Sequence, residues 1–287
     1  MNNPMKQVTN EKAPPTKLHQ AHSHRCFELR RGEVPLLISV PHTGTEIPDT
    51  YFNKMSSAAQ GSMDSDWFMK ELYEPIAINL GASIISPQYS RYLIDLNRPQ
   101  NDESLYPGQT TTGLCPSERF DGLSLYPNGD SVSVEDKQER IEFFWKPYHH
   151  ALKAELDRLK QRHGYALLWE GHSIKSVVPR LFEGRLPDLN LGTNQGLSCS
   201  SLINSSLEKS LNQLEDHYSW VLNGRFKGGY ITRHYGQPQE NIHAVQLELT
   251  QCNYLADENN PLWDEEYAQP ISKVIQTLIE SCLYCIG

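Results

Sequence analysis

The stretch "PLLISVPHTGTEIP", residues 35–48, decides how the chain is expected to fold. Residues 34–40 form an apolar run of the length and composition of a buried strand, bounded by Pro35 and Pro41. The run stops at His42, a titratable ring in a place where an ordinary turn residue is expected. In open α/β sheets ligands bind beyond the carboxyl ends of the strands, so His42 is a candidate site residue.

The same pattern, an apolar run that meets polar side chains, returns at three later places. "RYLIDLN" leads into Arg98, and "YALLWEG" leads into His172. "HAVQLELT" carries Glu248 at an alternating position of an otherwise apolar strand. These recurrences indicate several strand ends that could meet at one edge of a sheet.

Apolar residues at three- and four-residue spacing predict helices between these strands. The expected helices cover residues 64–80, 135–163 and 203–217 and a C-terminal segment, and the expected strands cover 34–40, 82–86, 91–97, 165–171, 229–234 and 243–250. Strands that alternate with helices indicate an α/β protein, with a central mixed sheet between two helical layers. Residues 98–130 are rich in Pro, Gly, Asn, Ser and Thr without a period, which predicts a binding loop, a lid or a disordered insert.

The composition favours one large domain of residues 31–287 after a polar tail of residues 1–30. A formal charge of −9 and the lack of a basic block argue against binding to nucleic acid or to an anionic membrane. No apolar run approaches the roughly 18 residues of a membrane span, and the first 34 residues lack the apolar core of a signal peptide. The expected location is therefore the cytoplasm, where the six scattered cysteines would stay reduced.

Two histidines and a carboxylate on rigid strand ends match the ligand set of a catalytic zinc site, which keeps one position open for water. His42 and His172 are the candidate nitrogen ligands. The third ligand is either Glu46, four residues beyond His42, or Asp66, near the start of a predicted helix. Glu248 would then serve as a separate general base.

The positions of the arginines are a second indication of a ligand site in this acidic chain. Six arginines fall near predicted strand ends or in the loops beside them: Arg91, Arg98, Arg180, Arg185, Arg225 and Arg233. The planar guanidinium suits bidentate binding of carboxylates better than lysine does. The expected ligand is therefore small and carries more than one negative charge.

Six segments of the chain resemble, in order, the motifs of the N-formylglutamate amidohydrolase family. They are "SVPHTGTEIP", "SRYLIDLNRP", "LWEGHSI", "PRLFEGRLPDLNLGT", "GGYITRHYG" and "VQLELT", within residues 34–255. That family is similar to zinc carboxypeptidase-like amidohydrolases, so the resemblance implies a phosphorylase/hydrolase-like α/β/α fold. It also implies one zinc ion on His42 and His172, and it favours Asp66 of "DSDWF" over Glu46, which stands one residue further from His42 than the glutamate of the relatives does.

The resemblance further implies the reaction, the hydrolysis of N-formyl-L-glutamate to formate and L-glutamate during histidine breakdown. Glu248 matches the base, and Arg98 would stabilise the charge that develops on the carbonyl oxygen. The residues expected to bind the dianionic substrate are Asn97, Arg91, Arg180, Arg185 and Arg233. Two alternatives remain open, a zinc amidohydrolase acting on another N-acyl amino acid or peptide, and a non-catalytic binder of acidic metabolites.

Overall fold

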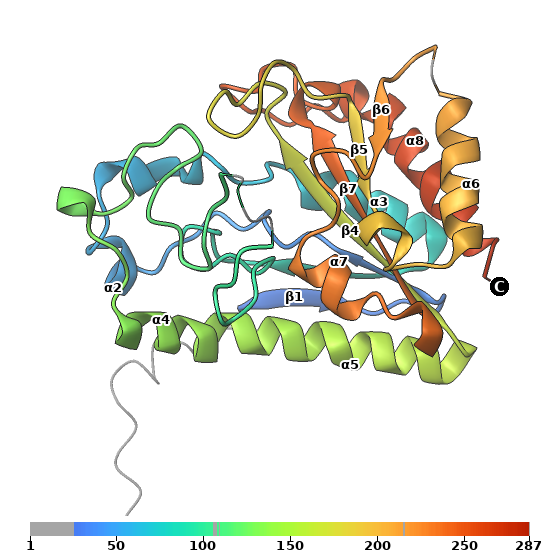
Figure 1. The fold of residues 1–287 in the computed structure, drawn as a ribbon, viewed down its shortest axis with the longest axis horizontal. Coiled ribbons are helices and arrows are strands. Elements are labelled where there is room, and N and C mark those ends of the chain that lie inside the picture. The colour runs from blue at the N-terminus through green and yellow to red at the C-terminus, as the bar shows by residue number, and fades with distance from the viewer. Residues whose placement is uncertain (1–25, 106–107, 109, 215, 287) are drawn as a thin grey trace, which may run out of the picture.

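A central mixed sheet organises the chain, which a computed structural model describes over residues 26–105, 108, 110–214 and 216–286 (Figure 1). Within these residues the sheet has seven strands in the order β1-β3-β2-β4-β7-β5-β6. Their bounds are β1 (Phe27–Arg30), β2 (Leu36–Ser39), β3 (Ser83–Pro87), β4 (Ala166–Ile174), β5 (Leu189–Gly192), β6 (Trp220–Leu222) and β7 (Ile242–Thr250). β3, β2, β4 and β7 run parallel, whereas β1 pairs antiparallel with β3 and β5 pairs antiparallel with β7.

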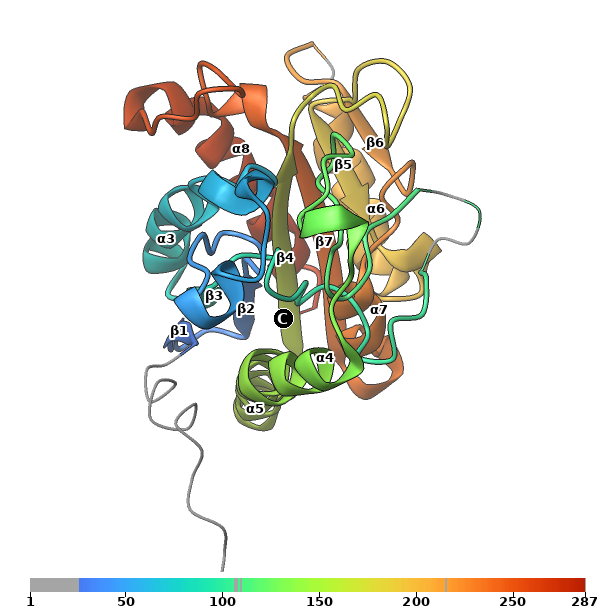
Figure 2. The same cartoon turned by 90° about the vertical axis from the view of Figure 1, so that its left-hand side faces the viewer.

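Helices cover both faces of this sheet. They are α2 (Asp49–Phe52), α3 (Met69–Leu80), α4 (Val134–Arg140), α5 (Lys146–His163), α6 (Ser201–Asn212), α7 (Tyr230–Tyr235) and α8 (Glu265–Leu283). One hydrophobic core joins α3, α6 and α8 to the sheet, and a second core on the opposite face joins α5 and α7 to it. Figure 2 shows α5 nearly end-on at the bottom of the view and α8 in its upper part. The predicted three-layer α/β/α architecture is confirmed.

The parallel strands are buried along their whole length, which explains their near-continuous apolar sequences. Side chains alternate between the two faces of a strand, so every second residue meets the same helices. In β7, Val245, Leu247 and Leu249 face the α3, α6 and α8 side, whereas Ala244 faces the α5 side. Gln246 and Glu248 continue the row of Ala244, so this face changes from apolar to polar towards the carboxyl end of β7.

α4 and α5 form one long helical segment joined by a π-helical turn, Ile141–Trp145. The Ser133 side chain caps the start of α4 by accepting a hydrogen bond from Asp136 N, and Gly164 ends α5 at a φ of 84°. In the turn, the Lys146 N–H donates to Ile141 O, five residues back. Pro147 follows directly and has no N–H to offer, so the regular helical ladder is interrupted here in any case.

The structure confirms the predicted strands at residues 34–40, 82–86, 165–171 and 243–250, with shifted ends. β4 runs on to Ile174, so His172 lies within the strand and not after it. The helix expected from residue 64 begins at Met69. Strands β5 and β6 were not predicted, because runs of three or four residues are too short to show a period.

Two predicted strands are wrong. Residues 91–97 form turns, and none of them pairs with a neighbouring strand. Two of their carbonyls bond instead to side chains of α4 and α5, since Arg140 Nη1 donates to Leu93 O at 2.8 Å and His149 Nε2 to Leu96 O at 2.9 Å. Residues 229–234 are mostly helical, as α7, in which Ile231 and Tyr235 lie one turn apart and both pack into the α5-side core. A six-residue segment is too short for its spacing to separate the two periods.

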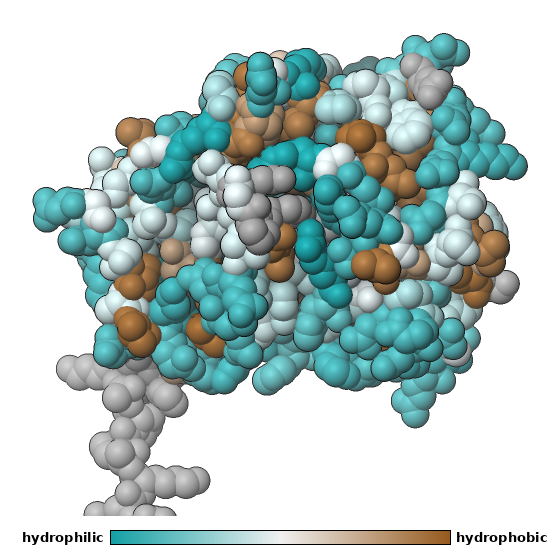
Figure 3. Space-filling model, viewed as in Figure 1, coloured by the Kyte–Doolittle hydropathy of each residue, from teal (hydrophilic) through white to brown (hydrophobic). Residues whose placement is uncertain are grey.

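Most of the predicted tail, residues 1–25, lies outside the described residues, and its last part, Phe27–Arg30, forms β1. The single domain of residues 31–287 stays a prediction. No helix in the described part of the chain is both long and apolar enough to cross a membrane. Hydrophilic residues cover most of the face shown in Figure 3, with hydrophobic ones in smaller groups.

Candidate active site

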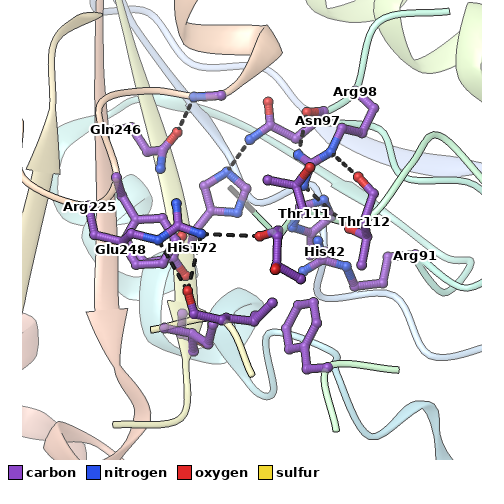
Figure 4. A pocket seen from close by; sticks show the side chains of 17 residues that line it. His42, Arg91, Asn97, Arg98, Thr111, Thr112, His172, Arg225, Gln246 and Glu248 are labelled. Atoms are coloured by element: carbon purple, nitrogen blue, oxygen red, sulfur yellow. Dashed lines mark hydrogen bonds between the residues drawn. The ribbon is translucent and has the colours of Figure 1, made fainter. Parts of the chain in front are cut away.

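Three neighbouring parallel strands bring the candidate residues to one edge of the sheet (Figure 4). His42 follows β2, His172 lies near the end of β4, and Glu248 lies near the end of β7. His172 and Glu248 are direct neighbours in the β4–β7 register, as are Glu170 and Gln246. The carboxyl ends of the strands therefore gather polar side chains that lie far apart in the sequence, from His42 to Glu248.

His42, Asp66 and His172 form a buried cluster whose donor atoms all lie within 4.8 Å of one another. Asp66 Oδ2 lies 3.1 Å from His172 Nδ1 and 3.7 Å from His42 Nδ1. Backbone bonds fix Asp66 in place, since its N–H donates to His42 O at 3.0 Å and its Oδ2 accepts from Ser173 N at 3.1 Å. Among the described residues, no other group of three such side chains is close enough to hold a metal ion.

A carboxylate holds the far nitrogen of each imidazole. Asp95 Oδ1 lies 2.7 Å from His42 Nε2, and Glu170 Oε1 lies 2.8 Å from His172 Nε2. Nε2–H is therefore the donor in both rings, which turns the Nδ1 lone pairs towards the centre of the cluster. This pairing of carboxylate and histidine is the arrangement that orients histidine ligands in metal sites.

The cluster also contains buried polar atoms without a partner among the described residues, His42 Nδ1 and Asp66 Oδ1. Buried donors and acceptors are nearly always satisfied, so unpaired ones at the meeting point of three ligand-type side chains fit a divalent cation. Two nitrogens and one carboxylate oxygen are donors that zinc accepts. The residues present therefore suit the expected ion.

The electrostatics of the cluster point the same way. Burial lowers the pKa of His172, but the Glu170 and Asp66 carboxylates outweigh it and raise that pKa to about 10. Burial raises the pKa of Asp66, yet its interactions with the His172 and His42 imidazoles bring it well below the usual range. The cluster thus favours a positive charge at its centre, which a proton or a cation can supply.

Glu46, the alternative ligand, lies away from this cluster. Its side chain is exposed and accepts a hydrogen bond from Gln88 Nε2 at 2.9 Å. It faces a separate groove that Trp67 and Phe68 also line. The structure therefore brings Asp66, and not Glu46, to the two histidines.

Glu248 sits beside the cluster with its carboxyl group facing the same cavity. Burial raises its pKa to about 8; the charges of Asp66 and Glu170 add to the rise, while His172 and Arg91 oppose it. A carboxyl group with a pKa near the working pH can both accept and return a proton, which is what general acid–base catalysis requires.

A cavity of about 70 Å³ opens in front of these groups. It is lined by His42, Arg91, Asn97, Arg98, Thr110, Thr111, Thr112, Phe120, His172, Ser173, Ile174, Leu181, Arg225, Phe226, Gly229, Gln246 and Glu248. Part of the 98–130 segment, Thr110 to Thr112, thus reaches the cavity, which agrees with the predicted binding loop. Such a small space, with charged and polar side chains among its lining residues, suits a small polar ligand.

The predicted substrate residues separate into two groups. Asn97 and Arg91 line the cavity, and so does Arg98, the residue predicted to stabilise charge. The other three stand outside the lining: Arg180 bonds to Glu118 and to Arg119 O, Arg185 bonds to Ser176 Oγ and Cys252 Sγ, and Arg233 Nε donates to Gly228 O. Position beside a strand end was too coarse a criterion for these arginines.

Arg91 is less available to a ligand than the sequence suggested. It is 7% exposed, and its Nη2 donates to Asp95 Oδ2 at 2.7 Å while Nη1 lies 3.6 Å from Asp66 Oδ1. Its guanidinium also stacks over the Phe120 ring, with CZ 4.9 Å from the centroid. Arg91 therefore braces the two carboxylates that surround His42.

Sequence reasoning missed Gln246, whose side chain lies in the cavity wall (Figure 4). Gln246 Oε1 accepts from Gly229 N at 2.7 Å, so the amide nitrogen is left as the donor available to a ligand. The signal was present, because Gln246 stands two residues before Glu248 in a strand and must share its face. Gly229 is itself required here, since a Cβ would lie 2.2 Å from Asn97 Nδ2.

Fold and site together define the class of the protein, a hydrolase built on an α/β sheet, with ligand-type histidines and a separate protonatable glutamate at the carboxyl ends of its strands. The chain belongs to the N-formylglutamate amidohydrolase family, whose sequence pattern matches residues 34–255. The predicted family and enzyme class, a hydrolase of an amide C–N bond, are confirmed.

Individual relatives agree with this membership. N-formylglutamate deformylase of Pseudomonas aeruginosa is 48% identical over 257 residues, and that of Pseudomonas putida is 45% identical over 259 residues. Each alignment covers 90% of this chain and 96% of the relative. The crystal structure of N-formylglutamate amidohydrolase from Ralstonia eutropha JMP134 superposes with a TM-score of 0.75 at 23% identity, covering 90% of this chain and 98% of that one, which shows a shared fold.

Proposed function

We propose that the protein hydrolyses N-formyl-L-glutamate to formate and L-glutamate, with one zinc ion held by His42, Asp66 and His172. The observation that carries the proposal is the buried cluster of these three side chains with Glu248 beside it in the same cavity. The deformylases that are 48% and 45% identical support the choice of substrate. A cytoplasmic role in histidine breakdown, which the resemblance implies, stays a prediction.

Three protein ligands leave one coordination position open, which is the pattern of catalytic zinc sites. When bound, zinc lowers the pKa of a water molecule that it binds and polarises a carbonyl group. Asp95 and Glu170 would keep both imidazoles in the tautomer that offers Nδ1. Arg91 would keep Asp95 and Asp66 ionised.

Glu248 carries the proton transfers of the reaction. Its carboxylate accepts a proton from the attacking water as the oxygen bonds to the formyl carbon. The same carboxyl group then gives the proton to the leaving nitrogen as the C–N bond breaks, so formate and L-glutamate are released without a net change at Glu248. Its buried position beside His172 suits this exchange at near-neutral pH.

Donors in the cavity wall would orient the substrate. Arg98 is held from behind, because its Nε donates to Thr112 O at 2.8 Å, and its guanidinium can stabilise charge on the carbonyl oxygen. Asn97, Arg225 and Gln246 line the same cavity and offer N–H groups to the carboxylates of the substrate. In this proposal Arg225 and Gln246 take the place of Arg180, Arg185 and Arg233.

Formate release tests the proposal. The purified chain is assayed with N-formyl-, N-acetyl- and N-succinyl-L-glutamate, then stripped with a chelator and reassayed after addition of zinc, manganese or cobalt. We expect release from the formyl substrate, loss of it on chelation, and recovery with zinc. Activity that survives complete metal removal contradicts the metal assignment, and a preference for the acetyl or succinyl substrate contradicts the choice of substrate.

A metal measurement separates loss of the ion from loss of the reaction. Metal content is determined for the wild type and for His42→Ala, both purified without chelator. We expect about one zinc per chain in the wild type and a large reduction in the variant, since the variant lacks one of three ligands. Glu46→Ala is the matched control, because Glu46 lies outside the cluster, and it should keep its zinc.

A further inference from the structure

The segment that carries Asn97 and Arg98 is irregular, yet several of its backbone groups are hydrogen-bonded. Asp95 N donates to Leu114 O at 2.7 Å, and Asn97 N donates to Asp95 Oδ1 at 2.8 Å. A strand would satisfy its carbonyls through a neighbouring strand. Here the carbonyls on either side of Asn97, those of Leu96 and Arg98, bond instead to side chains of the long helical segment.

Two aromatic donors make these bonds. His149 Nε2 donates to Leu96 O at 2.9 Å, and Trp145 Nε1 donates to Arg98 O at 2.9 Å. The role of His149 Nε2 is fixed because a carbonyl oxygen can only accept, which leaves Nδ1 to accept from the Tyr235 hydroxyl at 3.0 Å. Both side chains are buried, with exposed fractions of 6% for Trp145 and 3% for His149.

The geometry of the helix places the two donor side chains in direct contact. Trp145 ends the π-helical turn and His149 lies one turn further, on the same side of the helix. Their rings stack with centroids 3.8 Å apart and an angle of 28° between planes. A stacked pair in a packed core cannot turn one donor without moving the other.

Asn97, between the two anchored carbonyls, is held tightly at its other end as well. Its Oδ1 accepts from Ile231 N at 2.9 Å. Gly229 leaves just enough room for this amide. These contacts therefore fix the orientation in which Asn97 and Arg98 face the cavity.

We propose that Trp145 and His149 are positioning residues, which set the Asn97 amide and the Arg98 guanidinium against the cavity by holding the carbonyls of Leu96 and Arg98. The inference rests on the proposed function, because it takes Asn97 and Arg98 to contact the substrate. It extends that function to a helix that does not line the cavity. The π-helical turn is then part of the active-site design, as such turns often are.

The first test removes the donors and keeps the rings or the bulk. Trp145→Phe and His149→Leu should each lower kcat/KM by about 10- to 100-fold, because displacement of substrate-binding groups by about 1 Å has effects of this size. Zinc content should stay at the wild-type value, since neither residue contacts His42, Asp66 or His172. His149→Gln restores an N–H near Leu96 O and should recover most of the loss.

A matched control separates positioning from packing. Phe144 lies in the same π-helical turn and packs on Tyr51 and Tyr89, but it cannot donate to residues 96–98. Phe144→Leu should lower the melting temperature at least as much as Trp145→Phe does, with kcat/KM within about twofold of wild type. If the two variants lose activity in proportion to their melting temperatures, Trp145 only stabilises the fold and the inference is wrong.

A double-mutant cycle tests the route of the effect. If Trp145 acts through Asn97 and Arg98, Trp145→Phe should cost much less in an Asn97→Ala, Arg98→Ala background than in the wild type. Equal losses in both backgrounds overturn the inference while leaving the proposed function intact.

Amide hydrogen exchange gives a reading that needs no turnover. Trp145→Phe and His149→Leu should speed exchange at Asn97 N and Arg98 N, whereas Phe144→Leu should not. Unchanged exchange in both donor variants contradicts the inference. This outcome is independent of whether the wild type releases formate, so failure of the proposed function and failure of the inference remain distinguishable.

Discussion

The two sides of the candidate active site are built by different means. On the ligand side, His172 and Glu248 stand in register on neighbouring parallel strands, and His42 directly follows a third. On the substrate side, Asn97 and Arg98 lie in a segment without regular structure, held by side chains of a distant helix. The ladder of a sheet fixes the first set, whereas individual side-chain bonds fix the second. The ligand side should therefore be most sensitive to changes in the reacting groups and in the carboxylates that touch them, and the substrate side should also fail through residues that never meet the substrate.

The largest effect is expected on the ligand side, from Glu248→Gln. The amide keeps the shape but cannot take a proton, so turnover should fall by about 10² to 10⁴-fold while zinc content is unchanged. The measurement is kcat for formate release together with metal analysis. Glu46→Gln, an exposed change outside the cluster, is the control and should behave as wild type. Full activity in Glu248→Gln with zinc bound would show that another group is the base.

A smaller effect is expected one contact further out, from Asp95→Asn. Asp95 orients His42 and is paired with Arg91, and such supporting carboxylates typically contribute about 10- to 100-fold to metal affinity. Zinc affinity measured by competition with a chromogenic chelator should fall by that amount. An unchanged affinity would mean that the strand alone orients His42, which would sharpen the contrast with the substrate side.

On the substrate side, Gln246→Glu should raise KM at least about tenfold, with a smaller change in kcat. One carboxylate oxygen can still accept from Gly229 N, but the other places negative charge where the dianionic substrate binds, and like charges in close contact cost several kcal/mol. Arg180→Gln is the comparison, since Arg180 lies outside the cavity lining and pairs with Glu118. A KM effect from Arg180→Gln, and none from Gln246→Glu, would reverse this assignment of the substrate contacts.

The smallest expected effect concerns pH and the helix that holds the substrate side. Burial lowers the pKa of His149 to about 3, below its ordinary value of 6.5, although its bond to Leu96 O opposes the shift. The unfolded ring therefore binds a proton as pH falls below about 6.5 while the folded ring stays neutral. The free energy of unfolding should consequently decrease between about pH 6.5 and pH 3, by about 2 kcal/mol from pH 7 to pH 5 for this group.

Denaturant unfolding at pH 7 and pH 5 measures this term when wild type and His149→Gln are compared. Other groups titrate equally in both proteins, so the difference between their pH dependences isolates His149. The variant should lose less stability on acidification. Parallel behaviour of the two proteins would show that His149 is protonated without cost in the folded chain.

How far the sequence could predict the molecule follows from this same division. The parallel strands and long helices were predicted because burial on both faces, or on one stripe, leaves a period in the sequence. His42, His172 and Glu248 were found because they interrupt such runs at a recognisable place. The residues alone left Asp66 and Glu46 open, and the family resemblance favoured Asp66. In the structure the Asp66 N–H donates to the His42 carbonyl, which brings Asp66 to the two histidines.

The substrate side was harder because its determinants are not periodic. Residues 91–97 look like a strand by composition, but Arg91 is buried against Asp95 and the carbonyls go to helix side chains. Arg180, Arg185 and Arg233 were chosen from their position along the chain, which does not say where a long side chain points. Gln246 was missed although the alternation of β7 places it beside Glu248.

The lengths of the strands have a consequence for association between this protein and other chains. The longest strands lie in the middle of the sheet, with nine residues each in β4 and β7. The two edge strands are short, with four residues in β1 and three in β6. Such short edge strands expose few unpaired N–H and C=O groups to a strand of another chain, which disfavours edge-to-edge aggregation. The long strands β4 and β7, which would pair best with another chain, each have a neighbouring strand on both sides and carry His172 and Glu248 of the candidate active site.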